Sequence, residues 1–294
     1  MKPEPLKLAT PASIFAMLEW AITKLPDQAQ PFSSESPRLD AEILLASVLD
    51  VSRAYLKTWP EKKLSPEQQK NFQALIIKRQ QGQPVAYLLG EWEFWSLPIK
   101  VTPDTLIPRP ETERLVELAL EKCTLKVATV ADLGTGSGAI ALALATENPA
   151  WSLFATDISP KALAIATANA TALGLNNINF FAGSWFSALP DTQFDLIVSN
   201  PPYIAQHDPQ LQSCVINWEP KSALIAEAQG LADLAAIISQ APLFLKPGAW
   251  LILEHGYNQG AAVANLFQQH GYGQIITEQD LEGRDRVSCG QWPA

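Results

Sequence analysis

Apolar residues recur every three or four positions in three segments near the start of the chain, residues 10–25, 37–50 and 65–82. This is the period of a helix that buries one face. The first segment begins with a Thr-Pro pair. The third begins with a serine and a proline and ends at a glycine, which are common signals for the start and end of a helix. The pattern therefore predicts short amphipathic helices in a small bundle.

The pattern changes after this bundle. Aromatic and β-branched residues surround a glycine and a serine in YLLGEWEFWSLPIKV (87–101), which indicates a β-hairpin. The segment TPDTLIPRPETE (102–113) is interrupted by prolines and is typical of a loop between domains. We therefore expect a helical bundle over residues 1–83, a hairpin and linker over 84–114, and a second domain over 115–294.

Strands and helices alternate in the rest of the chain. A helix through residues 111–123 comes first, and alanine-rich helical runs follow at 139–147 and 159–175. Short apolar and aromatic runs predict seven strands, at residues 129–133, 151–157, 178–183, 194–200, 249–255, 273–279 and 285–290. This alternation favours an α/β fold with a mostly parallel sheet that helices cover on both faces. Ligands of such sheets bind at the carboxyl ends of the strands.

The composition limits the functions that the chain can have. With 294 residues and 47% hydrophobic content, the chain can bury a sizeable core and form two domains. The three cysteines are far apart and only three histidines are present, so we expect neither a metal site nor a disulfide framework. The sequence shows no long apolar run and no signal-peptide layout, which favours a soluble cytoplasmic protein without a membrane partner.

Charge is distributed unevenly along the chain. Residues 1–127 carry 16 acidic and 16 basic side chains, whereas residues 128–294 carry 14 acidic and five basic ones. The second part therefore accounts for the whole net charge of −9. A domain that grips a nucleic-acid backbone usually has an excess of basic residues. Direct binding of nucleic acid is therefore not expected.

A glycine-rich turn follows the first strand of the second domain. In ADLGTGSGAIALALA, Gly134, Gly136 and Gly138 let the backbone turn sharply and approach a ligand closely. A dinucleotide site normally has the spacing G-x-G-x-x-G, but Ala139 stands at the position of its last glycine. The loop predicts a ligand site, with a plain strand-to-helix turn and a nicotinamide site as alternatives.

Two aspartates accompany this loop. Asp157 ends the second strand, about twenty residues beyond the glycines, where a carboxylate can accept hydrogen bonds from both hydroxyls of a ribose. The alternative for Asp157 is capping of the helix that begins at Ser159 and Pro160. Asp132 precedes the glycines and would favour a ligand with an ammonium group over a pyrophosphate. The alternative for Asp132 is a solvated strand end.

The fourth strand runs into FDLIVSNPPYI (194–204), where an asparagine, two prolines and a tyrosine follow an apolar run. One interpretation is a rigid turn with an asparagine cap. In a sheet of this kind, however, the turn lies next to the first strand and its side chains enter the same crevice as the glycine loop. The Asn200 side-chain oxygen and the Pro201 carbonyl can then accept the hydrogens of a planar nitrogen, and Tyr203 can pack against the planar group. This arrangement would turn the nitrogen lone pair toward a methyl donor.

With these residues assembled, the chain resembles the Rossmann-like class I S-adenosylmethionine methyltransferases, and more narrowly the release factor glutamine methyltransferase family, often called PrmC or HemK. The resemblance runs nearly from end to end. Its motifs are GEWEFWSLPIKVTPDTLIPRPETE, DLGTGSGAIALALA, ATDIS, GSWF, FDLIVSNPPYI, LKPGAWLILEHG and GRDRV. NPPY is shared with amino-methyltransferases that act on DNA, RNA and proteins, whereas IPRPETE together with the helical N-terminal domain is more specific.

The resemblance implies a seven-stranded, mostly parallel sheet, a small all-helical N-terminal domain and S-adenosylmethionine as cofactor. Residues implied to bind the cofactor are Gly134, Thr135, Gly136, Ser137, Gly138, Asp157, Trp185 and Asn200. Residues implied to bind the substrate are Asn200, Pro201, Pro202 and Tyr203, with Asn200, Pro201 and Tyr203 as the catalytic ones. The implied substrate is the glutamine of the Gly-Gly-Gln loop of class I release factors, methylated on its side-chain amide nitrogen. The helical domain is the expected docking surface for the rest of the release factor.

Three alternatives remain at this point. A methyltransferase of the same fold would act on a ribosomal-protein glutamine or on an amino group of a nucleic acid. A nicotinamide oxidoreductase would need a hydride-handling set of residues that the sequence does not show. A cofactor-binding protein without activity would not need the complete set at Asn200. We further expect Arg109, Glu111 and Glu113 to close the crevice or brace the hinge, Glu254 and His255 to be buried at a strand end, and residues 204–218 to form a flap.

Overall fold

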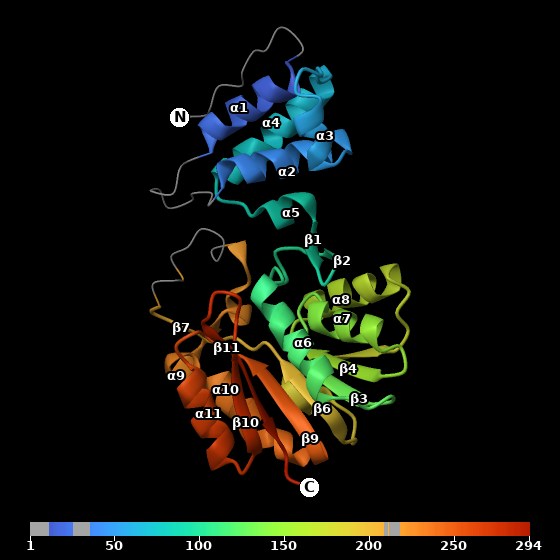
Figure 1. The fold of residues 1–294 in the computed structure, drawn as a ribbon, viewed down its shortest axis with the longest axis vertical. Helices are drawn as coiled ribbons and strands as arrows, with labels where there is room; N and C mark the ends of the chain where they lie inside the picture. The colour runs from blue at the N-terminus through green and yellow to red at the C-terminus, as the bar shows by residue number, and fades with distance from the viewer. Residues whose placement is uncertain (1–11, 26–35, 209–210, 212–217) are drawn as a thin grey trace. The chain divides into compact units, whose positions relative to one another are not determined.

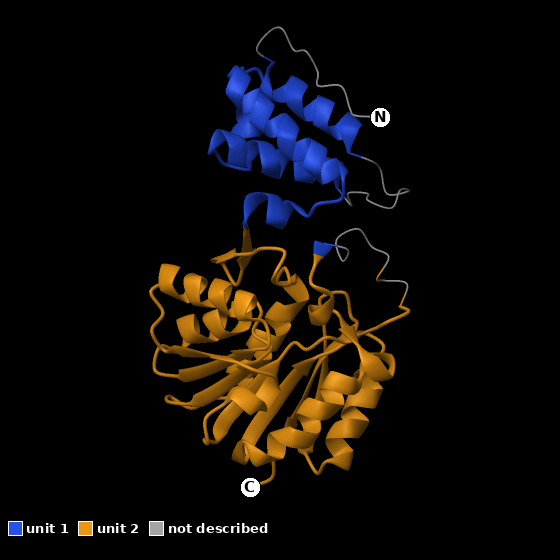
Figure 2. Cartoon of the chain, turned by 180° about the vertical axis from the view of Figure 1, so that it is seen from behind, with its two compact units in different colours: residues 1–90, 212–218 blue, residues 91–211, 219–294 orange. Residues whose placement is uncertain are grey.

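The computed structural model of the chain describes residues 12–25, 36–208, 211 and 218–294 (Figure 1). The chain forms two compact units, one comprising residues 1–90 and 212–218 and the other comprising 91–211 and 219–294 (Figure 2). Part of the flap expected at residues 204–218 lies outside the described residues, as does the Thr-Pro signal before the first helix.

Five helices form the described part of the first unit. Their bounds are α1 Ile14–Lys24, α2 Pro37–Leu49, α3 Arg53–Thr58, α4 Pro66–Gln80 and α5 Val85–Leu89. Each of the first four begins after a serine whose hydroxyl accepts a hydrogen bond from a backbone N–H of the first turn. The three helices that the sequence predicts here are confirmed. The short helices α3 and α5 contain too few turns to produce a recognisable period of apolar residues.

The apolar faces of these helices meet in one core. Met17, Leu44 and Phe72 are fully buried in it. An ion pair between Arg79 Nε and Asp40 Oδ2, at 2.7 Å, links α4 to α2. The first unit is thus the small helical bundle that the sequence predicts.

A seven-stranded sheet forms the centre of the second unit (Figure 1). Its strands are β3 Thr129–Leu133, β4 Ser152–Asp157, β5 Ile178–Ala182, β6 Phe194–Ser199, β9 Leu245–Glu254, β10 Gly273–Gln279 and β11 Asp285–Gln291. Their order across the sheet is β10-β11-β9-β6-β3-β4-β5, and β11 alone in this sheet runs in the direction opposite to the other six strands. The predicted α/β fold with a mostly parallel, seven-stranded sheet is confirmed.

The order of the strands reverses next to β3. The chain first adds β4 and β5 on one side of β3 and then places β6 on the other side. Leu133 and Ser199, the last residues of β3 and β6, are partners in the parallel register, and the Ser199 hydroxyl donates to the Leu133 carbonyl at 2.7 Å. Ligand crevices form at such switch points, outside the carboxyl ends of the strands. The glycine loop after β3 and the NPPY segment after β6 therefore begin side by side.

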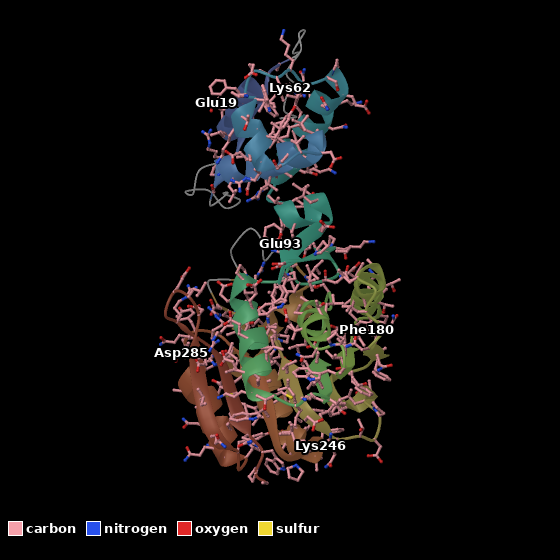
Figure 3. The ribbon with its side chains drawn as sticks, turned by 45° about the vertical axis from the view of Figure 1, so that its right-hand side comes forward. Glu19, Lys62, Glu93, Phe180, Lys246 and Asp285 are labelled. Atoms are coloured by element: carbon pink, nitrogen blue, oxygen red, sulfur yellow. The ribbon has the colours of Figure 1, made fainter. Side chains whose placement is uncertain are left out.

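One carboxylate connects three neighbouring strands at their amino ends, on the side of the sheet opposite to the glycine loop. Asp195 Oδ2 in β6 accepts the backbone N–H of Thr129 at 2.8 Å, where β3 begins. The same oxygen lies 2.7 Å from Lys246 Nζ, where β9 begins (Lys246 is labelled in Figure 3). The amino ends are thus held together by side chains, and the carboxyl ends are left to the functional loops.

Helices and short strands complete the described part of the second unit. Their bounds are α6 Glu113–Lys122, α7 Ala139–Glu147, α8 Pro160–Ala172, α9 Glu227–Gly230, α10 Ala232–Gln240, α11 Gly260–Gln269, β7 Ile204–Ala205 and β8 Ile225–Ala226. Helix α7 contacts α6 and α8, and α10 contacts α11. Buried Leu234 and Ile237 of α10 and Val263 and Phe267 of α11 share one apolar core with Ile197 of β6. The helices thereby bury the central strands and fix the loops at their ends.

The predicted hairpin consists of β1 Glu91–Phe94 and β2 Leu97–Lys100. Its turn residues Trp95 and Ser96 both have left-handed φ, 54° and 56°, as in a type I′ turn. Glu113 Oε1 accepts the Trp95 backbone N–H at 2.8 Å, so Glu113 braces this hairpin. The sequence pattern placed the segment before Gly90 in the hairpin, and this is wrong. That segment is helix α5, which Gly90 ends in a left-handed conformation.

Asn169 of α8 joins the hairpin to the glycine loop. Its side chain is buried, its Oδ1 accepts the Lys100 N–H at 2.9 Å, and its Nδ2 donates to the carbonyls of Lys100 at 3.1 Å and Ser137 at 2.9 Å. A buried amide with its donors and acceptor paired holds its neighbours in one geometry. The hairpin and the glycine loop are therefore both linked to α8 by this one side chain.

Candidate active site

A cavity of about 560 Å³ lies at the carboxyl ends of the central strands, within the second unit. Its wall includes two glycines of the loop after β3, the end of β4 and the start of α8. Residues 104–106, residues 183–185, part of the segment 220–225 and Asp233 also contribute to it. Asn200 and Pro202 also line it. The structure thus brings the glycine loop, Asp157, Trp185 and the start of NPPY to one cavity, as the strand order leads us to expect.

The glycine loop is held open by backbone hydrogen bonds. The N–H groups of Gly134 and Thr135 both donate to the carbonyl of Thr156, at 2.8 and 2.9 Å. Gly134 and Gly136 line the cavity in left-handed conformations with φ of 72° and 58°. Side chains larger than hydrogen strain such a backbone. Thr135, Ser137 and Gly138 belong to the loop but do not line the cavity.

Asp157 is oriented by two backbone donors. Its Oδ2 accepts the Gly136 N–H at 2.9 Å and its Oδ1 accepts the Ser159 N–H at 2.8 Å. Each carboxylate oxygen can accept a further hydrogen bond. The cap of α8 is Ser159, whose hydroxyl accepts the Ala162 N–H, so the alternative capping role for Asp157 is wrong.

Asp132 lies behind the loop and not in the cavity wall. It is completely buried, its Oδ2 accepts the Thr135 hydroxyl at 2.6 Å, and its Oδ1 has no hydrogen-bond partner among the described residues. Burial raises the pKa of Asp132 to about 7, against the opposing effect of the Thr135 hydrogen bond. The alternative of a solvated strand end is therefore wrong, and Asp132 faces the loop from inside the protein.

Trp185 forms one side of the cavity in a conformation that is rare for its residue type. Its φ is 48°, and its ring lies so near Gly134 that a Cβ on Gly134 would be 3.0 Å from Trp185 Cζ3. Burial raises the pKa of Asp233, and a hydrogen bond with the Trp185 side chain opposes this shift. Backbone strain of this kind persists where the surroundings hold it, as they often do at binding sites.

The charged side chains among the described residues of the cavity wall are acidic. They are Asp104, Asp157 and Asp233, and no lysine, arginine or histidine stands among these described residues. Asp104 is paired with Lys161 outside the wall, at 3.1 Å and with both side chains exposed. Such a wall attracts a positively charged ligand and repels phosphate groups. Asp104 lies within the quoted segment TPDTLIPRPETE, to which the sequence assigned only a linker role, and Asp233 lies far along the chain from every motif.

Asn200 lines the cavity, and its side-chain amide is hydrogen-bonded to Thr112. Its Nδ2 donates to Thr112 Oγ1 at 3.2 Å, and its residue lines the cavity next to Pro202. Pro201 and Tyr203 do not line the cavity. The Tyr203 hydroxyl instead donates to Glu254 Oε1 at 3.1 Å, and burial together with the Glu254 charge raises the pKa of Tyr203.

A partly buried ion pair fixes the loop that precedes α6. Arg109 Nη2 lies 2.5 Å from Glu219 Oε2, while Glu219 Oε1 accepts the Ile107 N–H at 3.1 Å. Burial raises the pKa of Glu219, and Arg109 opposes this shift. The pair connects two segments whose neighbours, Leu106 and Pro220, both line the cavity.

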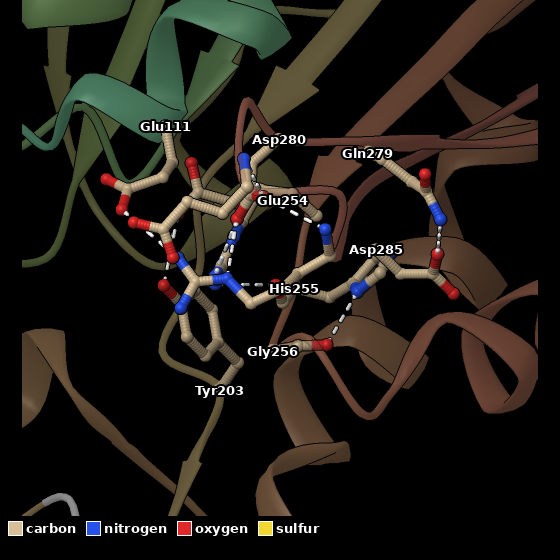
Figure 4. A network of polar contacts seen from close by, with 11 residues as sticks. Glu111, Tyr203, Glu254, His255, Gly256, Gln279, Asp280 and Asp285 are labelled. Atoms are coloured by element: carbon tan, nitrogen blue, oxygen red, sulfur yellow. Dashed lines mark hydrogen bonds and ion pairs between the residues drawn. The ribbon is translucent and has the colours of Figure 1, made fainter.

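Glu254 and His255 are buried at the end of β9, as the sequence predicts. His255 Nε2 lies 2.8 Å from Ser288 Oγ, and the His255 carbonyl accepts a hydrogen bond from Arg286 at 3.4 Å. Arg286 also pairs with Asp280 at 3.3 Å, and its positive charge lowers the pKa of Glu254, which accepts the Tyr203 hydroxyl (Figure 4). The residues behind NPPY therefore form a connected set of buried polar groups.

The described part of the chain contains no group of three or more metal-binding side chains close enough to hold a metal ion. Among the same residues, none of the helices combines the length and the apolar character needed to cross a membrane.

Two protein families match the chain. The PrmC N-terminal domain matches residues 16–90, and the Methyltransferase small domain matches residues 112–221. The release factor glutamine methyltransferase of Vibrio cholerae is 52% identical over 276 residues, which are 94% of this chain and 96% of that protein. The protein of the same name from Aliivibrio fischeri is 47% identical over 281 residues, 95% of this chain and 98% of that protein.

Solved structures of low sequence identity share the fold. The catalytic domain of hMettl16, in complex with MAT2A 3′UTR hairpin 6, has a TM-score of 0.55 and 19% identity, and the match covers 68% of this chain and 76% of that chain. At this identity the likeness concerns the fold alone.

Proposed function

The chain belongs to the family of release factor glutamine methyltransferases, and we propose that it methylates the side-chain amide nitrogen of the glutamine in the Gly-Gly-Gln motif of class I release factors. The observation that carries this proposal is the shared cavity: Asp157, Trp185 and Asn200 come from the ends of different strands and line one hollow. A donor and an acceptor of a methyl group can therefore meet there.

S-adenosylmethionine is the methyl donor of this family, and the wall of the cavity fits it. The donor carries a positively charged sulfonium and an ammonium group, and the charged side chains in the wall are Asp104, Asp157 and Asp233. A dinucleotide with its pyrophosphate would meet the same three carboxylates unfavourably. When bound, S-adenosylmethionine supplies an electrophilic methyl group.

The residues that would hold this cofactor follow from the positions of their free acceptors. Asp157 is fixed by Gly136 and Ser159 and keeps acceptor capacity on both oxygens, which suits two ribose hydroxyls. Gly134 and Gly136 allow the methionine and ribose portion to lie against the backbone. Trp185 would form the aromatic side of the site.

Asn200 and the following prolines would orient the substrate. The amide nitrogen of glutamine is a poor nucleophile because its lone pair is delocalised. If Asn200 Oδ1 accepts one of its hydrogens, the lone pair is directed at the methyl donor and the charge that develops on nitrogen is stabilised. The two prolines that follow restrict the backbone of this turn, so Asn200 needs little reorganisation.

The proposal is tested by incubating the full chain with radiolabelled S-adenosylmethionine and a class I release factor. A release factor with alanine in place of the Gly-Gly-Gln glutamine is the matched control. We expect label in the first protein and none in the control. Parallel reactions with ribosomal proteins and with DNA or RNA test the alternative acceptors. Label in one of these, with none in the release factor, would overturn the proposal.

Two finer points belong to the same proposal. The helical domain, residues 1–83, would dock the body of the release factor, and binding of the intact release factor by a chain lacking this domain should be weaker. The expected cytoplasmic location and the absence of nucleic-acid binding are predictions from the charge and composition of the sequence.

A further inference from the structure

Gln259 connects the NPPY segment to two other turns of the second unit. It directly precedes α11, and the residue is only 7% exposed. Its Oε1 accepts the Gly256 backbone N–H at 2.8 Å, and its Nε2 donates to the carbonyls of Tyr203 at 3.0 Å and Gln229 at 3.3 Å. All three partners are backbone groups, and a backbone N–H can only donate while a carbonyl can only accept. These contacts therefore fix which end of the Gln259 amide faces each partner.

The NPPY turn has few hydrogen-bond donors of its own. Pro201 and Pro202 have no backbone N–H, so these two residues cannot donate a hydrogen bond that would hold the turn. The carbonyl of Tyr203, directly after them, accepts the Gln259 amide N–H. Asn200 and Pro202 line the cavity, so the position of this turn decides where they meet a substrate.

The second carbonyl that Gln259 holds belongs to a strained turn. Ala228, Gln229 and Gly230 all have left-handed φ, at 50°, 58° and 85°. This conformation is unfavourable for residues with a Cβ and persists where the surroundings hold it. The turn leads into α10, which carries Asp233 of the cavity wall. One buried amide thus holds two segments that contribute to the same cavity.

Gly230 shows how closely the strained turn approaches the NPPY segment. A Cβ at this position would lie 2.1 Å from the Tyr203 carbonyl oxygen and 2.7 Å from Gln259 Nε2. At these distances any side chain would force the carbonyl to move, so glycine alone fits here. The Tyr203 carbonyl is therefore packed against the strained turn and hydrogen-bonded to Gln259 at the same time.

We propose that Gln259 is a positioning residue for methyl transfer: its amide fixes the Tyr203 carbonyl and thereby the turn that presents Asn200 to the substrate. This inference rests on the proposed function. Gln259 does not line the cavity, and it acts through the backbone of the turn. The glycine loop and Asp157 are held by backbone contacts of their own, so we expect cofactor binding to depend little on Gln259.

The kinetic test removes the amide and keeps the length of the side chain. For Gln259→Met we expect kcat with a release factor to fall roughly tenfold or more, because Asn200 is no longer aligned, while the Kd for S-adenosylmethionine stays within about threefold. Tyr272→Phe is the matched control: it removes one buried hydrogen bond to the Ile238 carbonyl, away from the cavity, and should keep kcat within about twofold. Parent-like kcat for Gln259→Met, or equal losses in both variants, would overturn the inference.

A pair of glycine substitutions tests the same carbonyl from its other side. Gly230→Ala and Gly271→Ala force alanine into nearly equal left-handed conformations, with φ of 85° and 83°. A Cβ at position 271 meets open space, whereas one at 230 displaces the Tyr203 carbonyl. We therefore expect kcat to fall roughly tenfold in the first variant and to stay within about twofold in the second. Equal kcat in the two would contradict the inference.

A double variant shows whether the two substitutions act at one place. Gly230→Ala combined with Gln259→Met should lose less kcat than the product of the two single losses, because both changes act on the Tyr203 carbonyl. Losses that multiply would show independent effects and count against the proposed role.

Hydrogen exchange tests the inference without a substrate. In a peptide spanning residues 199–205 the prolines have no amide, so the signal comes from few backbone N–H groups. One of them is Ile204 N–H, which donates to the Leu224 carbonyl at 2.9 Å directly after the NPPY turn. Exchange in this peptide should be roughly tenfold faster in Gln259→Met than in the parent and in Tyr272→Phe, with unchanged exchange in the glycine loop.

The exchange experiment also separates this inference from the proposed function. If the parent methylates no release factor but the exchange differs as expected, the proposed function fails and the anchoring of the NPPY turn by Gln259 stands. Equal exchange in the parent and in Gln259→Met would overturn the anchoring, whatever the activity.

Discussion

Arg109 and Glu219 are separated by 110 residues in the chain and form an ion pair with 2.5 Å between Nη2 and Oε2. The pair is asymmetric: the Glu219 side chain is fully buried, and the Arg109 side chain is 30% exposed. Leu106, which precedes Arg109 in the chain, and Pro220, which follows Glu219, both line the cavity. Two segments that contribute Leu106 and Pro220 to the cavity wall are therefore linked by one contact between distant parts of the second unit.

Loss of Arg109 should destabilise the protein more than neutralisation of its partner. Arg109→Ala leaves a buried carboxylate without its cation, and we expect a loss of about 2 kcal/mol, less than for a fully buried pair because Arg109 is partly solvated. Glu219→Gln keeps an acceptor for the Ile107 N–H and should cost less. Urea unfolding of both variants measures the difference; equal losses would show that the charge on Glu219 is unimportant.

Removal of the Asn200 side chain should affect turnover and not cofactor binding. For Asn200→Ala we expect kcat to fall roughly a hundredfold or more, the scale for loss of an aligned polar group in a transition state. The Kd for S-adenosylmethionine, measured by calorimetry, should change by no more than about threefold. Asn176→Ala, at an exposed position, is the matched control. Parent-like turnover of Asn200→Ala would remove the residue from the mechanism.

Asp157 should show the opposite behaviour. Asp157→Ala removes the acceptors for two ribose hydroxyls, and we expect the Kd for S-adenosylmethionine to rise roughly tenfold to a hundredfold, the scale of hydrogen bonds to a charged group. Asp157→Asn keeps one acceptor oxygen and should give an intermediate Kd. Calorimetric titration of the three proteins decides the matter, and an affinity that is equal in all three excludes the ribose role.

The buried Asp132 should make stability depend on pH. Its pKa in the folded protein is about 7, above its ordinary value of 3.8. The folded state therefore holds the proton more tightly, so Asp132 favours folding below about pH 4 and this contribution is lost as the pH rises to about 7.

Asp132→Asn stays neutral at every pH. The Tm of this variant should therefore improve relative to the parent as the pH rises from about 4 to 7, with little further change above about pH 8. Asp191→Asn, at an exposed position, controls for the general change in charge. A Tm difference that does not vary with pH would contradict the buried titration.

Two glycines of the loop offer a matched comparison. Both Gly134→Ala and Gly136→Ala force alanine into a left-handed conformation, at a cost of about 1 kcal/mol each. A Cβ at position 136 meets open space, whereas one at 134 lies 3.0 Å from the Trp185 ring. We therefore expect a larger loss of stability for Gly134→Ala in denaturant unfolding. The excess should disappear in a Trp185→Leu background; its persistence there would mean that Trp185 is not the cause.

The fold could be predicted from the sequence because its signals are local. Seven short apolar runs between turn residues correspond to the seven strands, and the glycine loop follows β3. Helices α10 and α11 gave weaker signals, since neither has a side chain that caps its first turn. Their pattern of apolar residues was therefore not accompanied by a start signal.

The candidate site was predictable only where a motif named its residues. Asn200, Asp157 and Trp185 line the cavity, but Asp233 belongs to the first turn of α10 and carries no motif. The contact of Thr112 with Asn200 spans 88 residues, and no local pattern encodes a pair of this kind. The burial of Asp132 could not be predicted from the sequence either. Asp132 stands near the end of a strand, where solvent exposure is common, yet packing covers it completely.

Asn169 connects the hairpin directly to the glycine loop. One amide fastens both the Lys100 backbone and the Ser137 carbonyl, so any stiffening of the loop is passed to β2 without an intervening flexible segment. Binding of the cofactor in the cavity should then reduce the mobility of β2, although β2 does not line the cavity. We therefore expect the hairpin, which begins directly after the helical unit ends at Gly90, to respond to cofactor binding through Asn169.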